Sequence, residues 1–146
     1  MTVKPAIREL RIEDYDQLIK LWNEAGLPSR PFGRDTRKAI ENQLRLRTAI
    51  YLIVEIEGRI VGSVLGTHDG RKGWINRLAV LPELQHRGIA RQLVREVEKR
   101  LAACDIHIVA CLIESWNGAS LEVFKRLGYE PLEGMHYLRK RDRSDV

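Results

Sequence analysis

Residues 78–101 constrain the fold more than any other part of the chain. An apolar, strand-like run stops at Pro82, a short polar loop follows, and a helix opens directly at Gly88. The first N–H groups of a helix have no partner inside it and lie at the positive end of its dipole. A glycine there lets phosphate oxygens approach the backbone closely. With Arg87 and Arg91 on either side of the glycine, the segment is predicted to hold an anion such as a pyrophosphate.

Two motifs follow one another in the second half of the chain. The first is Gln85-x-x-Gly88-x-Ala90, preceded by Leu78-Ala79-Val80, and the second is Asn117-x-x-Ser120, followed by Phe124 to Glu130. Together, and in this order, they resemble the GCN5-related N-acetyltransferases, the GNAT superfamily. No Gly-x-Gly-x-x-Gly or Gly-x-x-x-x-Gly-Lys-Ser/Thr pattern competes for the phosphate role.

The resemblance implies how acetyl-CoA, the expected cosubstrate, would be bound. In that family the strands before and after the phosphate helix splay apart, and the pantetheine arm lies in the gap. The backbone of Leu78, Ala79 and Val80 would then pair with the arm. Asn117 would reach the cofactor from the last helix, and Phe124 would pack against the arm. The pyrophosphate would be held by the side chain of Arg91 and by the backbone N–H groups of the turn before it. These N–H groups belong to Gln85, His86, Arg87, Gly88, Ile89 and Ala90.

The resemblance also implies direct acetyl transfer to an amine, with a backbone N–H near Val80 stabilising the oxyanion. The family commonly supplies a glutamate base on the fourth strand and a tyrosine acid on the last helix. This chain departs at both places. Trp74 and Asn76 are the fourth-strand residues expected to face the acceptor, and Phe124 stands where the tyrosine would be. None of the three can serve as the missing base or acid.

Several explanations for the missing groups stay open. The acceptor is either an amine of low pKa, which is partly neutral at pH 7, or one whose proton a water molecule relays to Glu114. His68 is a second candidate base, and Tyr137 a candidate acid. The alternative function is a catalytically weak or silent acyl-CoA-binding or regulatory module.

The acceptor site is expected between the loop that joins the first two helices and a terminal hairpin. Trp22, Phe32 and Trp116 are candidates for its lining. Arg30 and Arg34 would favour an anionic acceptor.

Composition excludes some classes of function. The chain has 146 residues, 44% of them hydrophobic and 31% charged, which suits one domain over residues 1–146. No apolar run approaches the roughly 18–20 residues that span a bilayer. The N-terminal sequence, interrupted by charges, is not a secretion signal. We therefore expect a cytoplasmic location and no membrane partner.

Charge and cysteine usage narrow the partners further. The net charge of +5 fits either a basic surface with a basic tail or attraction of a polyanion such as CoA. Nucleic acid is disfavoured, because neither a recognition-helix pattern nor aromatic residues among the basic ones are present. Cys104, Cys111 and the scattered histidines lack metal-site spacing, so no metal is predicted. Because the superfamily often dimerises, a homodimer stays open.

Hydrophobic periodicity predicts an α/β (α+β) fold, with a single mixed, mostly antiparallel sheet flanked by helices on both faces. A right-handed crossover would join the strands on either side of the phosphate helix. The strand over 106–113 is expected to be buried on both faces, and the chain is expected to end in a hairpin. The predicted strands are 6–11, 50–57, 59–67, 74–81, 106–113, 129–131 and 135–139, and the predicted helices are 13–25, 36–47, 88–103 and 117–127.

Overall fold

A computed structural model describes residues 4–146. Within these residues, five strands form one sheet in the order β1-β2-β3-β4-β5. The first four strands pair antiparallel, and β5 is parallel to β4. The strands are β1 (Ala6–Glu9), β2 (Ala49–Ile56), β3 (Arg59–His68), β4 (Gly73–Val80) and β5 (Val109–Cys111). The predicted mixed, mostly antiparallel sheet is confirmed.

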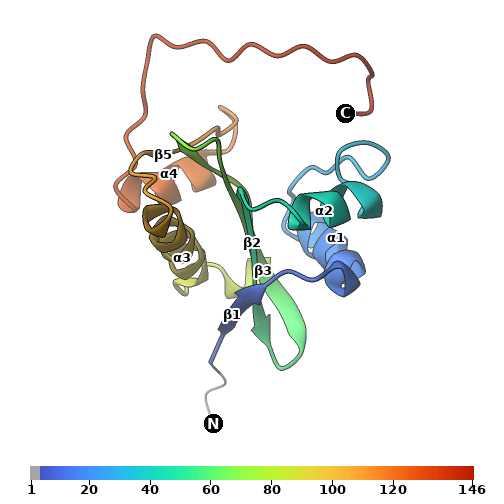
Figure 1. The fold of residues 1–146 in the computed structure, drawn as a ribbon. Coiled ribbons are helices and arrows are strands. Elements are labelled where there is room, and N and C mark those ends of the chain that lie inside the picture. Colours follow the sequence, from blue (N-terminus) through green and yellow to red (C-terminus); the bar gives the residue numbers. More distant parts are fainter. Residues whose placement is uncertain (1–3) are drawn as a thin grey trace.

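Helices cover both faces of this sheet. Figure 1 shows α1 and α2 on one side and α3 and α4 on the other. Within residues 4–146, no helix is long and apolar enough to cross a membrane. The helices are α1 (Tyr15–Glu24), α2 (Arg37–Leu44), α3 (Ile89–Ala103) and α4 (Gly118–Arg126), with 3-10 turns η1 (Ile12–Asp14) and η2 (Pro82–Leu84).

The β2–β3 hairpin follows from its two turn residues. Glu57 and Gly58 both have positive φ, 50° and 79°. Two consecutive residues of this kind are typical of the tight turn whose twist matches that of paired strands. The hairpin therefore places two apolar strands at the centre of the sheet.

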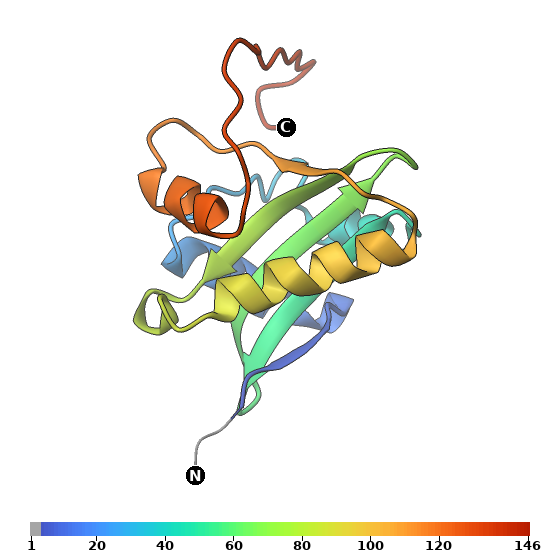
Figure 2. The same cartoon turned by 90° about the vertical axis from the view of Figure 1, so that its left-hand side faces the viewer.

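Helix α3 lies across the strands on one face (Figure 2). Its buried stripe includes Leu93, Val97 and Leu101. Glycines on the sheet make room for it: a Cβ at Gly66 would lie 2.5 Å from Val97 Cγ1, and one at Gly73 would lie 2.7 Å from Leu101 Cδ1. This close packing fixes the position of the helix N-terminus relative to the end of β4.

Two sequence predictions at the C-terminal end are wrong. The strand expected over 106–113 is limited to 109–111, and Ile108 and Leu112 are exposed. The reason is that β5 pairs with β4 alone, so its outer edge is open. The terminal hairpin over 129–131 and 135–139 is absent, and residues 130–144 are exposed along their whole length.

The other element boundaries differ by a few residues. The first helix is divided into η1 and α1, and α2 ends at Leu44 rather than near Arg47. Thr36 caps α2, because its hydroxyl accepts a hydrogen bond from Ala39 N–H at 3.1 Å. Such an N-cap satisfies one of the orphan donors of the first turn.

Candidate functional site

The sheet has an open edge along the second half of β4. The β4–β5 ladder ends at the pair Ile75 and Cys111, while β4 continues to Val80. A register shift on the β3 side lies opposite Arg77, whose φ is +56°. A bulge of this kind bends a strand and increases its twist. Among the described residues 4–146, residues 76–80 of β4 therefore have no strand partner on the β5 side.

The main chain of Val80 faces this open edge. Leu81 N–H donates to Val61 C=O at 2.9 Å, and Gly62 lies opposite Val80. Because hydrogen-bonded and non-hydrogen-bonded pairs alternate along an antiparallel ladder, the N–H and C=O of Val80 point away from β3. The side chain of Gln85 donates to Val80 C=O at 3.1 Å, which joins the strand end to the turn before α3.

This turn has the backbone geometry of an anion-binding site. His86 and Gly88 both adopt left-handed conformations, with φ of +63° and +85°. The N–H groups of residues 86–91 have no acceptor within residues 4–146, and the first helical bond is from Gln92 N–H to Gly88 C=O. Successive free N–H groups around left-handed residues form a concavity for anions, here at a helix N-terminus.

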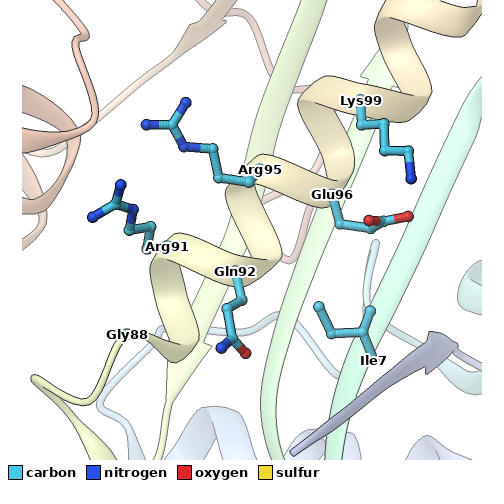
Figure 3. A pocket seen from close by; sticks show the side chains of 7 residues that line it. All are labelled: Ile7, Gly88, Arg91, Gln92, Arg95, Glu96 and Lys99. Carbon is cyan, nitrogen blue, oxygen red and sulfur yellow. The ribbon is translucent and has the colours of Figure 1, made fainter.

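Basic side chains extend this site along α3. An open groove of about 540 Å³ begins at Gly88 and runs between α3 and Ile7 of β1. Figure 3 shows Arg91 and Arg95 pointing to the same side of α3, with Glu96 on the other side. The positive charge of the turn is therefore reinforced along the helix.

Sequence reasoning missed a buried polar network on the opposite face of β4. The Arg77 guanidinium forms an ion pair with buried Asp35 at 3.0 Å and also donates to Pro28 C=O. Its Cζ lies 4.9 Å from the ring centroid of Trp22. Trp22 Nε1 donates to Ser63 Oγ at 3.0 Å, and Ser63 donates to Arg77 C=O at 2.9 Å. The network links the bulge of β4 to the loop between α1 and α2.

Because Trp22 belongs to this network, the set of residues that can line the acceptor site differs from the prediction. Trp22 is fully buried, so its predicted place on an open acceptor surface is wrong. Phe32 and Trp116 are exposed, and so are Arg30 and Arg34. Of the predicted lining, those residues remain accessible to an acceptor.

The candidate acid and base residues lie at the surface of the molecule. Glu114 is exposed in the loop after β5, and its C=O accepts a hydrogen bond from Asn117 N–H at 2.9 Å. Asn76 is exposed on β4. His68 ends β3, where its Nδ1 accepts a hydrogen bond from Gly70 N–H at 3.0 Å. Tyr137 lies in the exposed C-terminal segment.

Helix α4 contributes one polar group and one apolar group. Asn117 caps the helix, its Oδ1 accepting a hydrogen bond from Ser120 N–H at 3.2 Å. Phe124 is buried and packs edge to face on Tyr129, with the ring centroids 5.1 Å apart. The helix therefore offers the amide nitrogen of Asn117 to a ligand, and it offers no phenol at position 124.

Neither a reactive thiol nor a metal site finds support among the described residues. Burial raises the pKa of the Cys111 thiol to about 11, so the thiol is neutral at pH 7. Within the described residues 4–146, no group of three or more histidine, cysteine, aspartate or glutamate side chains could hold a metal ion.

The mixed sheet, its open β4 edge and the turn before α3 together have the arrangement of the acyl-CoA N-acyltransferase fold. Residues 6–129 match the acetyltransferase (GNAT) family, and the chain belongs to this family. The resemblance of the two sequence motifs is thereby confirmed.

Solved structures of acetyltransferases share the fold. An aminoglycoside N-acetyltransferase, AAC(6')-Iy, in complex with CoA is similar at 21% sequence identity and a TM-score of 0.80, over 97% of each chain. The PaiA N-acetyltransferase of Thermoplasma acidophilum, in complex with coenzyme A, is 20% identical with a TM-score of 0.77, over 87% of this chain and 90% of that one. A protein of Clostridium acetobutylicum described as a predicted acetyltransferase, solved with acetyl-CoA, is 16% identical with a TM-score of 0.77, over 93% of this chain and 96% of that one.

Proposed function

We propose that the chain is an N-acetyltransferase that transfers an acetyl group from acetyl-CoA to a primary amine of a small molecule or a protein. The observation that carries this proposal is the joint presence of an open β4 edge and six consecutive N–H groups, at residues 86–91, that have no acceptor in the part of the chain that the structure describes. An extended pantetheine arm needs main-chain partners, and a pyrophosphate needs donors. The residues present therefore fit the cosubstrate.

The proposed binding roles use mostly backbone groups. Leu78, Ala79 and Val80 pair with the pantetheine arm, and the turn from Gln85 to Ala90, with Arg91, holds the pyrophosphate. The free amide nitrogen of Asn117 is a further donor. Acetyl-CoA supplies the activated thioester. Val80 N–H, which faces the open edge, donates to the acyl oxygen as negative charge develops there, a contribution of about 3 kcal/mol in comparable sites.

Proton transfer is proposed to take place without an acid or base side chain in direct contact with the reacting groups. Phe124 cannot protonate a leaving thiolate, and the exposed amide of Asn76 can orient an acceptor but cannot take its proton. Glu114 is the candidate base, reached through water. A missing acid would cost about 10²-fold in rate. The acceptor is accordingly proposed to be an amine of low pKa, and exposed Arg30 and Arg34 favour one that carries negative charge.

The alternative is a catalytically weak or silent acyl-CoA-binding module, favoured by buried Phe124 at the position of the family's tyrosine. Incubation with acetyl-CoA and a panel of amines, read by mass spectrometry, separates the two. The panel includes amino acids, peptides and aminoglycosides, because aminoglycoside acetyltransferases are among the similar structures. An enzyme-dependent acetylated product supports transfer. CoA binding with no product from any amine would favour the silent module.

The proposal includes three broader statements. The chain acts as a single domain over residues 1–146, as a homodimer and in the cytoplasm. The family match over residues 6–129 supports the first. The exposed apolar side chains Leu132, Met135, Tyr137 and Leu138 near the end of the chain support the second.

A further inference from the structure

A single carboxylate organises the loop between α1 and α2. Asp35 Oδ2 accepts a hydrogen bond from Arg30 N–H at 2.6 Å, and Asp35 N–H in turn donates to Arg30 C=O at 2.9 Å. Asp35 C=O accepts a hydrogen bond from the hydroxyl of Tyr15 on α1, at 2.7 Å. These bonds close the turn that presents Arg30, Phe32 and Arg34, which are all exposed, while Asp35 itself is buried.

Arg77 ties this turn to the bulge of β4. Its guanidinium donates to Asp35 Oδ2 at 3.0 Å and to Pro28 C=O, and it lies over the ring of Trp22. The main chain of Arg77 is held separately, because its C=O accepts a hydrogen bond from Ser63 Oγ at 2.9 Å. One residue therefore fixes the bulge through its backbone and the loop through its side chain.

This tie lies close to the place where acetyl transfer is proposed. Arg77 and Val80 are both on β4, and three residues correspond to roughly 10 Å along a strand. The loop lies on the side of the sheet that α1 and α2 cover, whereas the turn of residues 86–91 leads into α3 on the other side (Figure 1). Acetyl-CoA on the turn and an acceptor on the loop would therefore reach the open β4 edge from opposite faces.

Stability alone gives a poor reason for this arrangement. An apolar pair of similar volume is often as stabilising as a buried ion pair, and the φ of +56° at Arg77 is costly for a residue with a Cβ. What an arginine adds is geometry, because its planar fork holds two acceptors at fixed positions and a lysine ammonium does not. The two acceptors here, Asp35 Oδ2 and Pro28 C=O, lie near the two ends of the loop.

We propose that Arg77 is a positioning residue for the amine acceptor. It holds the loop that carries Arg30 and Arg34 against the bulge, and so sets where an anionic group of the acceptor lies relative to the thioester. Arg77 acts through the loop, because its own side chain is largely buried and already paired. This inference rests on the proposed function, and it adds a residue that acts on the acceptor side alone.

Steady-state kinetics with an amine that the wild type acetylates tests this role. Arg77→Lys keeps the charge and loses the fork, so it is expected to raise the acceptor KM by about tenfold, with kcat and the acetyl-CoA KM little changed. Arg8→Lys is the matched control, because Arg8 also forms a forked pair, with Asp14, and β2 and β3 separate its strand from β4. Both KM values are expected to stay unchanged in the control. An unchanged acceptor KM in Arg77→Lys would overturn the proposal, and so would equal increases in the two variants.

Amide hydrogen exchange separates a failure of this inference from a failure of the proposed function. In Arg77→Lys the amides of Arg30 and Asp35 are expected to exchange at least about tenfold faster than in Arg8→Lys, while both variants bind CoA equally in calorimetry. Unchanged exchange in the loop would overturn the positioning role at any level of activity. If the wild type acetylates no amine, the proposed function fails, and exchange still decides whether Arg77 holds the loop. Asp35→Asn, with the same expected changes, replaces Arg77→Lys if that variant does not fold.

Discussion

At the scale of single residues, Gly88 and Arg77 adopt left-handed backbone conformations for different reasons. Gly88 has no atom within 4 Å of the position that a Cβ would take, so its φ of +85° leaves the turn open to a ligand. Arg77 carries a full side chain at φ +56°, and its guanidinium and C=O are both held by hydrogen bonds. Such strain in a non-glycine residue persists only where the surroundings over-determine it.

Gly88→Ala is expected to weaken CoA binding by about tenfold, because the added methyl group occupies the space that a phosphate would enter and the left-handed turn resists the side chain. The strain itself costs about 1 kcal/mol of stability. Gly70→Ala is a matched control, since Gly70 has φ +86°, open space around it and a position in the β3–β4 turn. Calorimetry with CoA should separate the variants. Equal affinity in both would contradict the role of the turn.

The Arg77–Asp35 pair is expected to couple the sheet to the α1–α2 loop energetically. Both side chains are largely buried, 14% and 9% exposed, so removing one partner leaves the other charge poorly solvated. Arg77→Met and Asp35→Asn should each lower the free energy of unfolding by about 2–3 kcal/mol. The double variant should lose clearly less than the sum. A urea-unfolding cycle with strictly additive losses would mean that the pair contributes nothing.

At the scale of elements, the edge strand β1 is tied to the turn η1 by Arg8. Its guanidinium donates to Asp14 at 2.8 and 3.0 Å and to Glu55 at 2.7 Å. The hydrogen bond from Arg8 lowers the pKa of Asp14, although burial acts in the opposite direction, and the N–H of Arg11 lowers it further. The short strand β1 therefore depends on an ionised carboxylate.

Stability is expected to fall in acid through Asp14. Its pKa is lower in the folded than in the unfolded chain, where it is about 3.9. The stabilisation is thus present above that value and is lost as the pH falls through the folded pKa. Urea midpoints between pH 6 and pH 3 should fall more steeply in the wild type than in Asp14→Asn. Parallel curves for the two proteins would remove Asp14 from the acid response.

The elements differ in how far the sequence predicts them. The β2–β3 hairpin and α3 are set by local signals, the Glu57-Gly58 turn and an apolar stripe after Gly88, and both predictions are confirmed. The segments 106–113 and 135–139 read as strands because they are apolar. However, a strand also needs a partner, and within residues 4–146 these segments have little or none. The periodicity of apolar residues indicates which side chains are suited to burial, but it does not indicate which other element packs against them.

In the candidate site, too, the sequence predicts local features but not contacts between distant residues. The turn before α3 is local, so Gln85-x-x-Gly88 predicts its left-handed backbone and its free N–H groups directly. Asp35 and Ser63 were not foreseen, because their contacts with Arg77 join residues distant in the chain. A bulge centred on an arginine has no sequence signature.

At the scale of the whole molecule, the fold places the open β4 edge and the N-terminus of α3 next to each other. Gly66 and Gly73 let α3 pack closely on the sheet, and Gln85 joins the turn to Val80. The family match over residues 6–129 covers all of these parts. We therefore propose, as the central claim, that the main chain of residues 86–91 receives the pyrophosphate of CoA.

Amide hydrogen exchange with and without CoA tests this claim most directly. In the free protein the amides of residues 86–91 should exchange fast, because they have no acceptor. At saturating CoA they should slow markedly, together with the β4 amides at 78–80, while the β3–β4 turn at Gly70 stays unchanged. Exchange at 86–91 that remains fast at millimolar CoA would contradict the account.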